Sequence, residues 1–138
     1  MSAKDIIHEP VVKALTNDGW TITDDPLVLR IGRRVAKADL GAERLIGATR
    51  DNERIAVEIK SFLQSSVMTE FEKALGQYML YEDFLDEIDA ERKVYMAVSQ
   101  STYTTLFQEA AFQKSLKRRN IRLIVVDLNV KKVVKWID

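Results

Sequence analysis

The sequence predicts an α/β fold in which a central mixed β-sheet is flanked by helices, giving a three-layer sandwich. Two observations lead to this prediction. Short segments with the apolar patterns of strands alternate along the chain with longer segments of helical periodicity, and the connections between them are short. The chain has 138 residues, of which 46% are hydrophobic, which is enough to bury a core without disulfides. We therefore expect one domain over residues 1–138.

The first half of the chain is predicted to form one helix followed by three extended segments. The helix should begin at Ser2 and run to about Asp18, because a glycine follows and can end it. The extended segments are predicted at 27–31, at about 37–49 and at 54–62. Asp51-Asn52 is typical of a hairpin turn between the second and the third of them.

The second half is predicted to alternate helices with strands. Helices are expected over 68–88 and 103–119, and strands over 93–99, 122–128 and 132–137. Thr69 and Glu72 fit a capping box at the start of the first of these helices. The strand over 93–99 is almost continuously apolar, which favours burial on both faces inside the sheet.

The composition excludes several classes of site. The sequence has no cysteine and a single histidine, so thiolate sites and zinc sites built from several histidines are excluded, and oxygen ligands for a hard cation such as Mg²⁺ or Mn²⁺ remain. The 21 basic and 21 acidic residues balance, so any binding of nucleic acid must be local. With no signal peptide or membrane-spanning run visible in the sequence, we expect a cytoplasmic protein that does not contact a membrane.

Two charged residues share one face of the predicted strand over 54–62. Side chains alternate along a strand, so the apolar Ile55, Val57 and Ile59 should face one way and Glu58 and Lys60 the other. Asp39 lies on the preceding extended segment, where strand pairing in the right register would bring its carboxylate to Glu58.

Two carboxylates on Mg²⁺ or Mn²⁺, with a lysine beside the attacking water, provide what phosphodiester hydrolysis requires. The pattern of Asp39, Glu58 and Lys60 therefore predicts a metal-dependent nuclease site. Glu43 shares the parity of Asp39 and is a reserve ligand. The alternative interpretation is an ion pair on a polar, solvent-facing sheet surface, which is common in a chain that is 30% charged.

Further polar residues could support such a site. Gln77 and Tyr81 are four residues apart on a predicted helix and hence adjacent, where they would position the active site or a DNA phosphate. Otherwise they are boundary residues of an amphipathic helix. Arg33, Arg34 and Lys37 precede Asp39 and would hold DNA phosphates, or else form a solvated loop.

These motifs resemble those of the PD-(D/E)xK nuclease superfamily, which has a restriction-endonuclease-like fold. Asp39 and Glu58-Ile59-Lys60 stand in the family order, and the segment from Gln77 to Tyr81 is similar to its QxxxY signature. The resemblance implies that Asp39, Glu58 and the Ile59 carbonyl bind Mg²⁺, while Lys60 orients or activates water.

The resemblance also implies a further ligand from the first helix. Glu9 matches in position an acidic residue that some branches bring to the metal, although His8 could equally point inward. Ala38 stands in place of the proline that often precedes the aspartate. A domain of this size would cut both strands of a duplex more readily as a homodimer.

Over nearly its full length the chain resembles the XisH family, named for an fdxN-element excision controlling factor. The resemblance rests on 3–9, 18–23, 39–43, 55–62 and 74–77. It implies a role in DNA excision together with a site-specific recombinase and a small companion, XisI. Two hypotheses follow: a Mg²⁺-dependent nuclease that binds DNA, or a non-catalytic accessory factor that recruits the companion or the recombinase to DNA.

Overall fold

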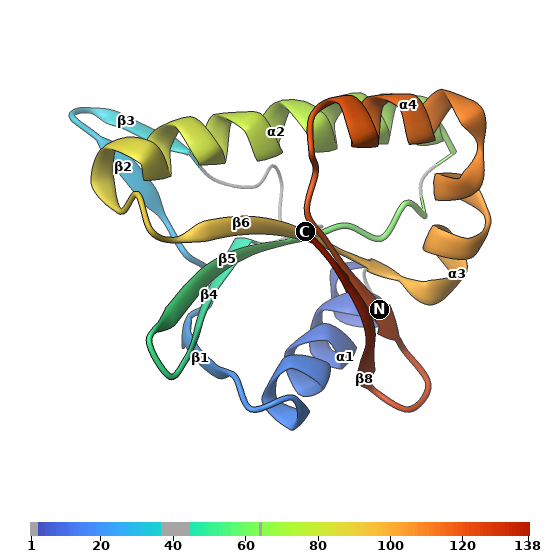
Figure 1. The fold of residues 1–138 in the computed structure, drawn as a ribbon, viewed down its shortest axis with the longest axis horizontal. Helices are drawn as coiled ribbons and strands as arrows, with labels where there is room; N and C mark the ends of the chain where they lie inside the picture. The colour runs from blue at the N-terminus through green and yellow to red at the C-terminus, as the bar shows by residue number, and fades with distance from the viewer. Residues whose placement is uncertain (1–2, 37–44, 64) are drawn as a thin grey trace.

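The computed structural model describes residues 3–36, 45–63 and 65–138, with a six-stranded sheet at its centre (Figure 1). In spatial order the strands are β1 (Thr21–Asp24), β4 (Leu45–Arg50), β5 (Glu53–Ile59), β6 (Lys93–Ser99), β7 (Leu123–Asp127) and β8 (Lys132–Ile137). The middle pairs, β5 with β6 and β6 with β7, are parallel, and the remaining neighbours are antiparallel. The sheet is therefore mixed, as the sequence predicts.

Helices cover both faces of this sheet. They are α1 (Ala3–Asn17), α2 (Val67–Ile88), α3 (Gln100–Thr104) and α4 (Ala110–Arg118), with a 3₁₀ turn η1 (Leu106–Gln108) between the last two. α2 crosses one face with α4 near it, and α1 lies on the other (Figure 1). Alternate side chains enter the two cores: Ala56 and Met96 pack on the α2 side, and Val57 and Tyr95 on the α1 side. The predicted three-layer α/β sandwich is confirmed.

The β4–β5 hairpin and the strand β6 agree with the prediction, although β5 ends at Ile59 and not at residue 62. β4 and β5 form a hairpin whose turn contains Asp51, at a φ of 54°, and β6 has the predicted bounds. Its residues from Val94 to Val98 are buried, because β6 lies between two parallel neighbours under helices on both faces. Among the described residues, no helix is both long enough and apolar enough to cross a membrane.

The segment between α1 and β4 differs from the prediction. β1 was not predicted, and the strand expected at 27–31 is the shorter β2 (Leu29–Ile31). β2 pairs with β3 (Arg34–Ala36) in a separate two-stranded sheet and not with the central one. These strands have three or four residues each and are largely exposed, so they carry little of the period-two pattern that identifies a strand. The extended segment expected at 37–49 is described only from Leu45 onward.

Two predictions about the helices were wrong. α2 is capped by Ser66, whose Oγ accepts the Thr69 N–H at 3.4 Å, and not by a capping box that starts at Thr69. The helix expected over 103–119 is divided into α3, η1 and α4. The hydroxyls of Thr104 and Thr105 donate to the Gln100 and Ser101 carbonyls at 2.9 and 2.7 Å, and such local bonds compete with a continuous helix.

One buried tyrosine joins α2 to the sheet. Tyr78 is fully buried, its hydroxyl donates to the Val94 carbonyl at 3.1 Å, and it accepts the Arg122 backbone N–H at 3.0 Å. Burial raises the pKa of Tyr78 above its ordinary value. This hydroxyl therefore links α2, which carries Gln77, to the starts of β6 and β7.

We expect Tyr78→Phe to lower the free energy of unfolding by about 1–3 kcal/mol, because it leaves a carbonyl and an N–H without their partner. Urea denaturation measures the change. Tyr103→Phe is the matched control: Tyr103 is only half-buried, its hydroxyl makes no hydrogen bond within the described residues, and its loss should change stability by less than about 0.5 kcal/mol. Equal effects of the two substitutions would contradict the role assigned to Tyr78.

Candidate functional site

Glu58 on β5, and Lys60 just beyond the end of that strand, are directed toward α2. Ile55, Val57 and Ile59 belong to the core on the α1 side, whereas Ala56 belongs to the core on the α2 side. Because side chains alternate along a strand, Glu58 and Lys60 share the face of Ala56. The alternation of side chains expected from the sequence is therefore present, and both charged side chains lie beneath α2.

Lys60 meets two of the residues singled out from the sequence. Its Nζ lies 3.8 Å from Oε2 of Glu58 and donates to Oε1 of Gln77 at 2.5 Å. Gln77 comes from α2, so this hydrogen bond joins the helix to the end of β5. Tyr81 is one helical turn beyond Gln77 and is 1% exposed. The structure thus assembles Glu58, Lys60 and Gln77, with Tyr81 on the same side of α2.

The ion pair is buried. Glu58 and Lys60 are each 2% exposed. The strand partners of Glu58 are Leu45 on β4 and Met96 on β6, both apolar members of the core on the α2 side. Opposite charges attract more strongly in such surroundings than at a surface, but each also loses its hydration, so each depends on the other. The alternative of a solvent-facing ion pair is therefore excluded by the burial.

Several predicted site residues are not placed with this group. Asp39, Glu43 and Lys37 lie outside the described residues. Glu9 is exposed on α1, the helix that packs on the opposite face of the sheet. His8 is engaged elsewhere, because its Nε2 lies 2.9 Å from Oδ2 of Asp25.

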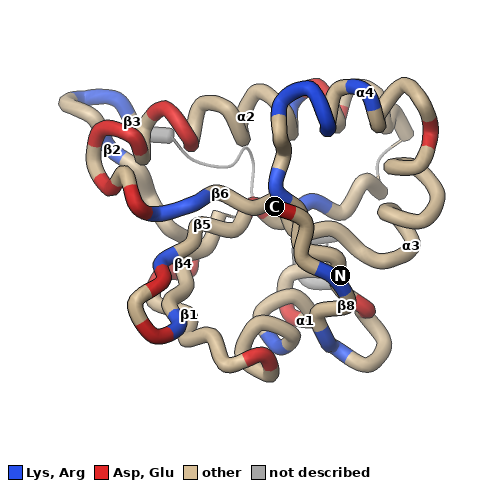
Figure 2. Tube along the Cα trace, in the orientation of Figure 1, with Lys and Arg blue, Asp and Glu red and all other residues tan. Residues whose placement is uncertain are grey.

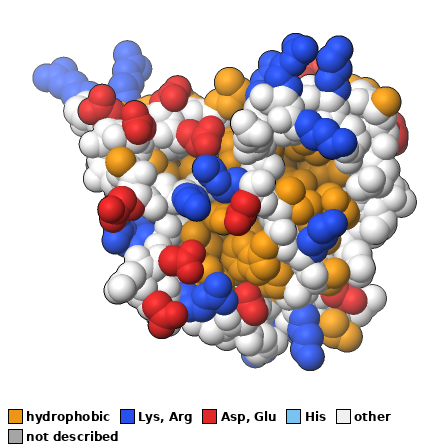
Figure 3. All heavy atoms as spheres, in the orientation of Figure 1, with side chains coloured by type: hydrophobic (Ala, Val, Ile, Leu, Met, Phe, Trp, Pro, Cys, Tyr) orange, Lys and Arg blue, Asp and Glu red, His pale blue; other side chains and the backbone are white. Residues whose placement is uncertain are grey.

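The predicted DNA-contacting arginines lie on the small hairpin. Arg33 and Arg34 are exposed in the turn and at the start of β3, and Arg30 is exposed on β2. Figure 2 shows basic segments at this hairpin and at the end of α4, while acidic segments follow the second half of α2. In Figure 3 the basic side chains project from the same two places, with hydrophobic side chains gathered between them. Positive charge is therefore local although the chain as a whole is neutral.

The chemistry of the donors fits a hard cation. Glu58 contributes a carboxylate and Ile59 a backbone carbonyl, and hard cations such as Mg²⁺ prefer oxygen ligands. The described pairing of β4 with β5 ends at Leu45 opposite Glu58, and the segment with Asp39 leads into Leu45. Within the described ranges, no three acidic or histidine side chains are grouped so as to hold a metal. A metal site built from three such side chains would therefore need residues outside these ranges.

Glu70 is a further polar residue of α2 that the sequence prediction does not include among the site residues. It is 7% exposed and lies on α2, about two helical turns before Gln77 and three before Tyr81. The three polar residues therefore follow one side of the helix. The spacing is visible in the sequence, but Glu70 lies in the first turn of the predicted helix, where an acidic residue needs no further explanation.

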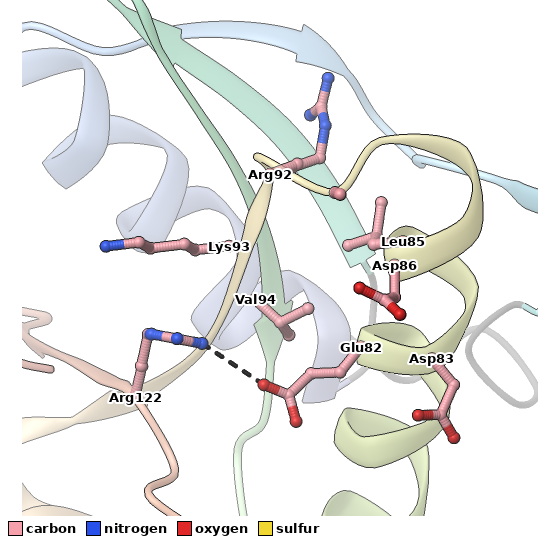
Figure 4. A pocket seen from close by; sticks show the side chains of 9 residues that line it. Glu82, Asp83, Leu85, Asp86, Arg92, Lys93, Val94 and Arg122 are labelled. Atoms are coloured by element: carbon pink, nitrogen blue, oxygen red, sulfur yellow. Dashed lines mark hydrogen bonds and ion pairs between the residues drawn. The ribbon is translucent and has the colours of Figure 1, made fainter.

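A hollow near the end of α2 has a lining of mixed charge. It has a volume of about 280 Å³ and is lined by acidic and basic side chains together (Figure 4). Arg122 Nη1 lies 3.4 Å from Oε2 of Glu82, and Arg92 donates to Asp89 and to the Ile55 carbonyl at 3.1 Å each. These two arginines are therefore already engaged by the protein itself.

Comparisons with known proteins agree with one another. The model of the XisH protein family matches residues 1–134. The crystal structure of an XisH family protein from Nostoc punctiforme is 38% identical, with a TM-score of 0.88 over 97% of this chain and 100% of that chain. That of an fdxN element excision controlling factor protein from Anabaena variabilis is 39% identical, with a TM-score of 0.88 over 97% and 99%. A comparison with curated proteins finds no match.

Proposed function

The chain belongs to the XisH family, and on that premise we propose that it binds DNA and hydrolyses phosphodiester bonds with Mg²⁺ or Mn²⁺ during excision of a DNA element. The observation that carries the proposal is the contact of Lys60 with Glu58 and Gln77. An acidic residue near the end of a strand and a lysine just beyond that end, covered by a helix that supplies glutamine and tyrosine, form the arrangement expected of a PD-(D/E)xK nuclease.

In this proposal Asp39, Glu58 and the Ile59 carbonyl hold the cation. Mg²⁺ bound there would stabilise the negative charge that develops on the phosphate. An ammonium has three N–H donors, and one of those on Lys60 is directed at Gln77 Oε1. Gln77 therefore fixes the position of the Lys60 charge, which can orient a water or a phosphate oxygen. Tyr81 supports the same side of the site, and Glu9 remains a proposed additional ligand.

Contact with DNA is assigned to Arg33, Arg34 and Lys37. The first two are exposed on the hairpin, and Lys37 and Asp39 follow them in the chain. Contacts between arginine or lysine and phosphate add affinity without sequence preference and weaken as salt concentration rises. Because the chain has no net charge, we propose that further affinity comes from a partner protein.

A second function is favoured by the burial of the charged pair. Both Glu58 and Lys60 are 2% exposed, and a buried ion pair can serve the structure alone. In that case the protein is a non-catalytic accessory factor that brings an XisI-like companion or a site-specific recombinase to the excised element. The fold would then be a scaffold, as occurs where one fold serves several functions.

Calorimetric titration with Mn²⁺ separates the two functions. We expect the wild type to bind the ion and both Asp39→Asn and Glu58→Gln to lose that binding, because each removes one of the two carboxylates. Glu53→Gln is the matched control, since Glu53 is exposed at the other end of β5 and should bind as the wild type does. Binding that survives in Glu58→Gln would contradict the proposed site.

The same variants are then assayed for cleavage of supercoiled, linear and single-stranded DNA with Mg²⁺ or Mn²⁺. Loss of cleavage together with loss of metal binding supports the nuclease. A wild type that binds DNA but cuts none of these substrates with either ion supports the accessory function.

A further inference from the structure

A cleft opens at the ends of the parallel strands, close to Lys60 in the chain. It has a volume of about 400 Å³ and lies where β5, β6 and β7 end, beside Ile7 of α1 and Val67 of α2. The carboxyl ends of parallel strands are a common position for ligands in α/β folds. Ser61 and Phe62, which directly follow Lys60, form part of its wall. A ligand in this cleft would therefore contact the same strand end as the candidate site.

The wall of the cleft is uncharged. Six of the described residues that line it are apolar and five carry hydroxyl groups, and no acidic or basic side chain is among them. A phosphate would find no cation there, and a purely aliphatic ligand would leave the hydroxyls without partners. The chemistry of the cleft therefore fits a neutral molecule that has both apolar surface and hydrogen-bonding edges.

Two of the hydroxyls are available to such a ligand. Ser99 uses its hydroxyl to cap α3 and to donate to Thr102 at 3.0 Å, and Thr105 donates to the Ser101 carbonyl at 2.7 Å. The hydroxyls of Ser61 and Ser101, in contrast, make no hydrogen bond to other described residues. Ser61 is 6% exposed, so its hydroxyl is nearly enclosed and lines the cleft from the end of β5.

The backbone beside Ser61 is held in an unusual conformation. Phe62 has a φ of 55°, which non-glycine residues rarely adopt, and its ring packs edge-on against Phe107 at 5.3 Å. Such a conformation persists only where the surroundings impose it, and it is frequent at binding sites. Leu63 follows at the rim and is 58% exposed. The cleft thus has a fixed wall and an apolar rim.

We propose that this cleft binds the base and sugar of a single nucleotide that lies outside the DNA helix. This inference rests on the proposed function, because the Lys60 site at the same strand end would act on the adjoining phosphodiester. A nucleoside is neutral, has apolar faces and offers hydrogen-bonding edges to Ser61 and Ser101. The preferred substrate is accordingly DNA with an unpaired or extruded base, which has already lost the stacking that a paired base must give up.

The test compares two DNA duplexes without divalent ions. One carries a single bulged 2-aminopurine and the other the same base paired with thymine, and titration with the protein gives both affinities. We expect the bulged duplex to bind at least about tenfold more tightly, with a change in 2-aminopurine fluorescence. Ser101→Phe, which fills the cleft from an exposed position, should abolish this preference.

Thr104→Phe is the control, because Thr104 is exposed on the same short helix and lines a different hollow. It should keep the preference. Equal wild-type affinities for the two duplexes, or a preference that survives in Ser101→Phe, overturn the proposal. Titration with the four deoxynucleosides, followed by NMR, needs no duplex binding. We expect at least one to shift the Ser61 and Ser101 amide signals, and no shift with any of them is a second result that overturns it.

Cleavage assays keep this inference separate from the nuclease function. A protein that prefers the bulge but never cuts DNA overturns the nuclease proposal and leaves the cleft assignment in place. A protein that cuts DNA but treats the two duplexes alike overturns only the cleft assignment.

Discussion

Replacement of Glu58 by alanine should lower the free energy of unfolding by about 3–5 kcal/mol, because it removes the carboxylate that lies 3.8 Å from the buried Lys60 ammonium. Lys60 is 2% exposed and would keep Gln77 as a neutral partner. Urea denaturation at neutral pH measures the loss. Glu53→Ala, at the exposed end of the same strand, is the control and should change stability by less than about 0.5 kcal/mol.

The double substitution Glu58→Leu with Lys60→Met should recover most of that loss. Replacement of a buried ion pair by apolar residues of similar volume is often neutral or stabilising, because neither charge must then be desolvated. The neighbours Leu45 and Met96 are already apolar. A double-mutant cycle gives the coupling between the two positions. If Glu58→Ala is no more destabilising than Glu53→Ala, the pair does not have the energetic role assigned to it.

This cycle bears on function as well as on stability. If the apolar double variant is as stable as the wild type, the fold does not need the charges. The Glu58–Lys60 pair would then be better explained by a role in catalysis than by a role in stability. If the double variant unfolds easily, the accessory function gains support, because the pair would be holding the scaffold together.

The parts of the fold that the sequence predicts well are those with long and regular patterns. The apolar run of β6 is continuous from Val94 to Val98, and the helical period of α2 extends over several turns. The bounds predicted from these two patterns agree with the structure to within one residue. The small hairpin of β2 and β3 and the division between α3 and α4 were not predicted. They depend on a tight turn at Gly32 and on threonine hydroxyl contacts, which are local and interrupt no apolar pattern.

The sequence predicts which residues of the candidate site lie together, but it does not predict that they are buried. The periods of strand and helix are enough to place Glu58 with Lys60 and Gln77 with Tyr81, and the structure brings Lys60 to Gln77. The sequence does not reveal which layer covers a strand face, so the burial of the ion pair was not foreseen. Nor does it show that Asp25 engages His8, since that contact joins two segments far apart in the chain.

Lys60→Met should reduce the rate of Mg²⁺-dependent DNA cleavage by about 10³-fold, because it removes a fixed positive charge beside the reacting phosphate. The variant also removes the ammonium that lies 3.8 Å from Glu58, so the assay is run at a temperature where circular dichroism shows the variant folded. Lys73→Met is the control, since Lys73 is exposed on α2 and its loss should leave cleavage unchanged. A Lys60→Met protein that retains a tenth of the wild-type rate would contradict the assigned role.

Gln77 tests whether the position of the Lys60 charge matters as well as its presence. Gln77→Leu keeps the lysine but removes the oxygen that holds it, so we expect the cleavage rate to fall by about tenfold while DNA affinity stays the same. Gln77→Glu retains an oxygen acceptor and should restore most of the rate. A purely structural glutamine would change stability without this separation of rate from affinity. Equal rates for Gln77→Leu and the wild type would show that Gln77 does not set the position of the Lys60 charge.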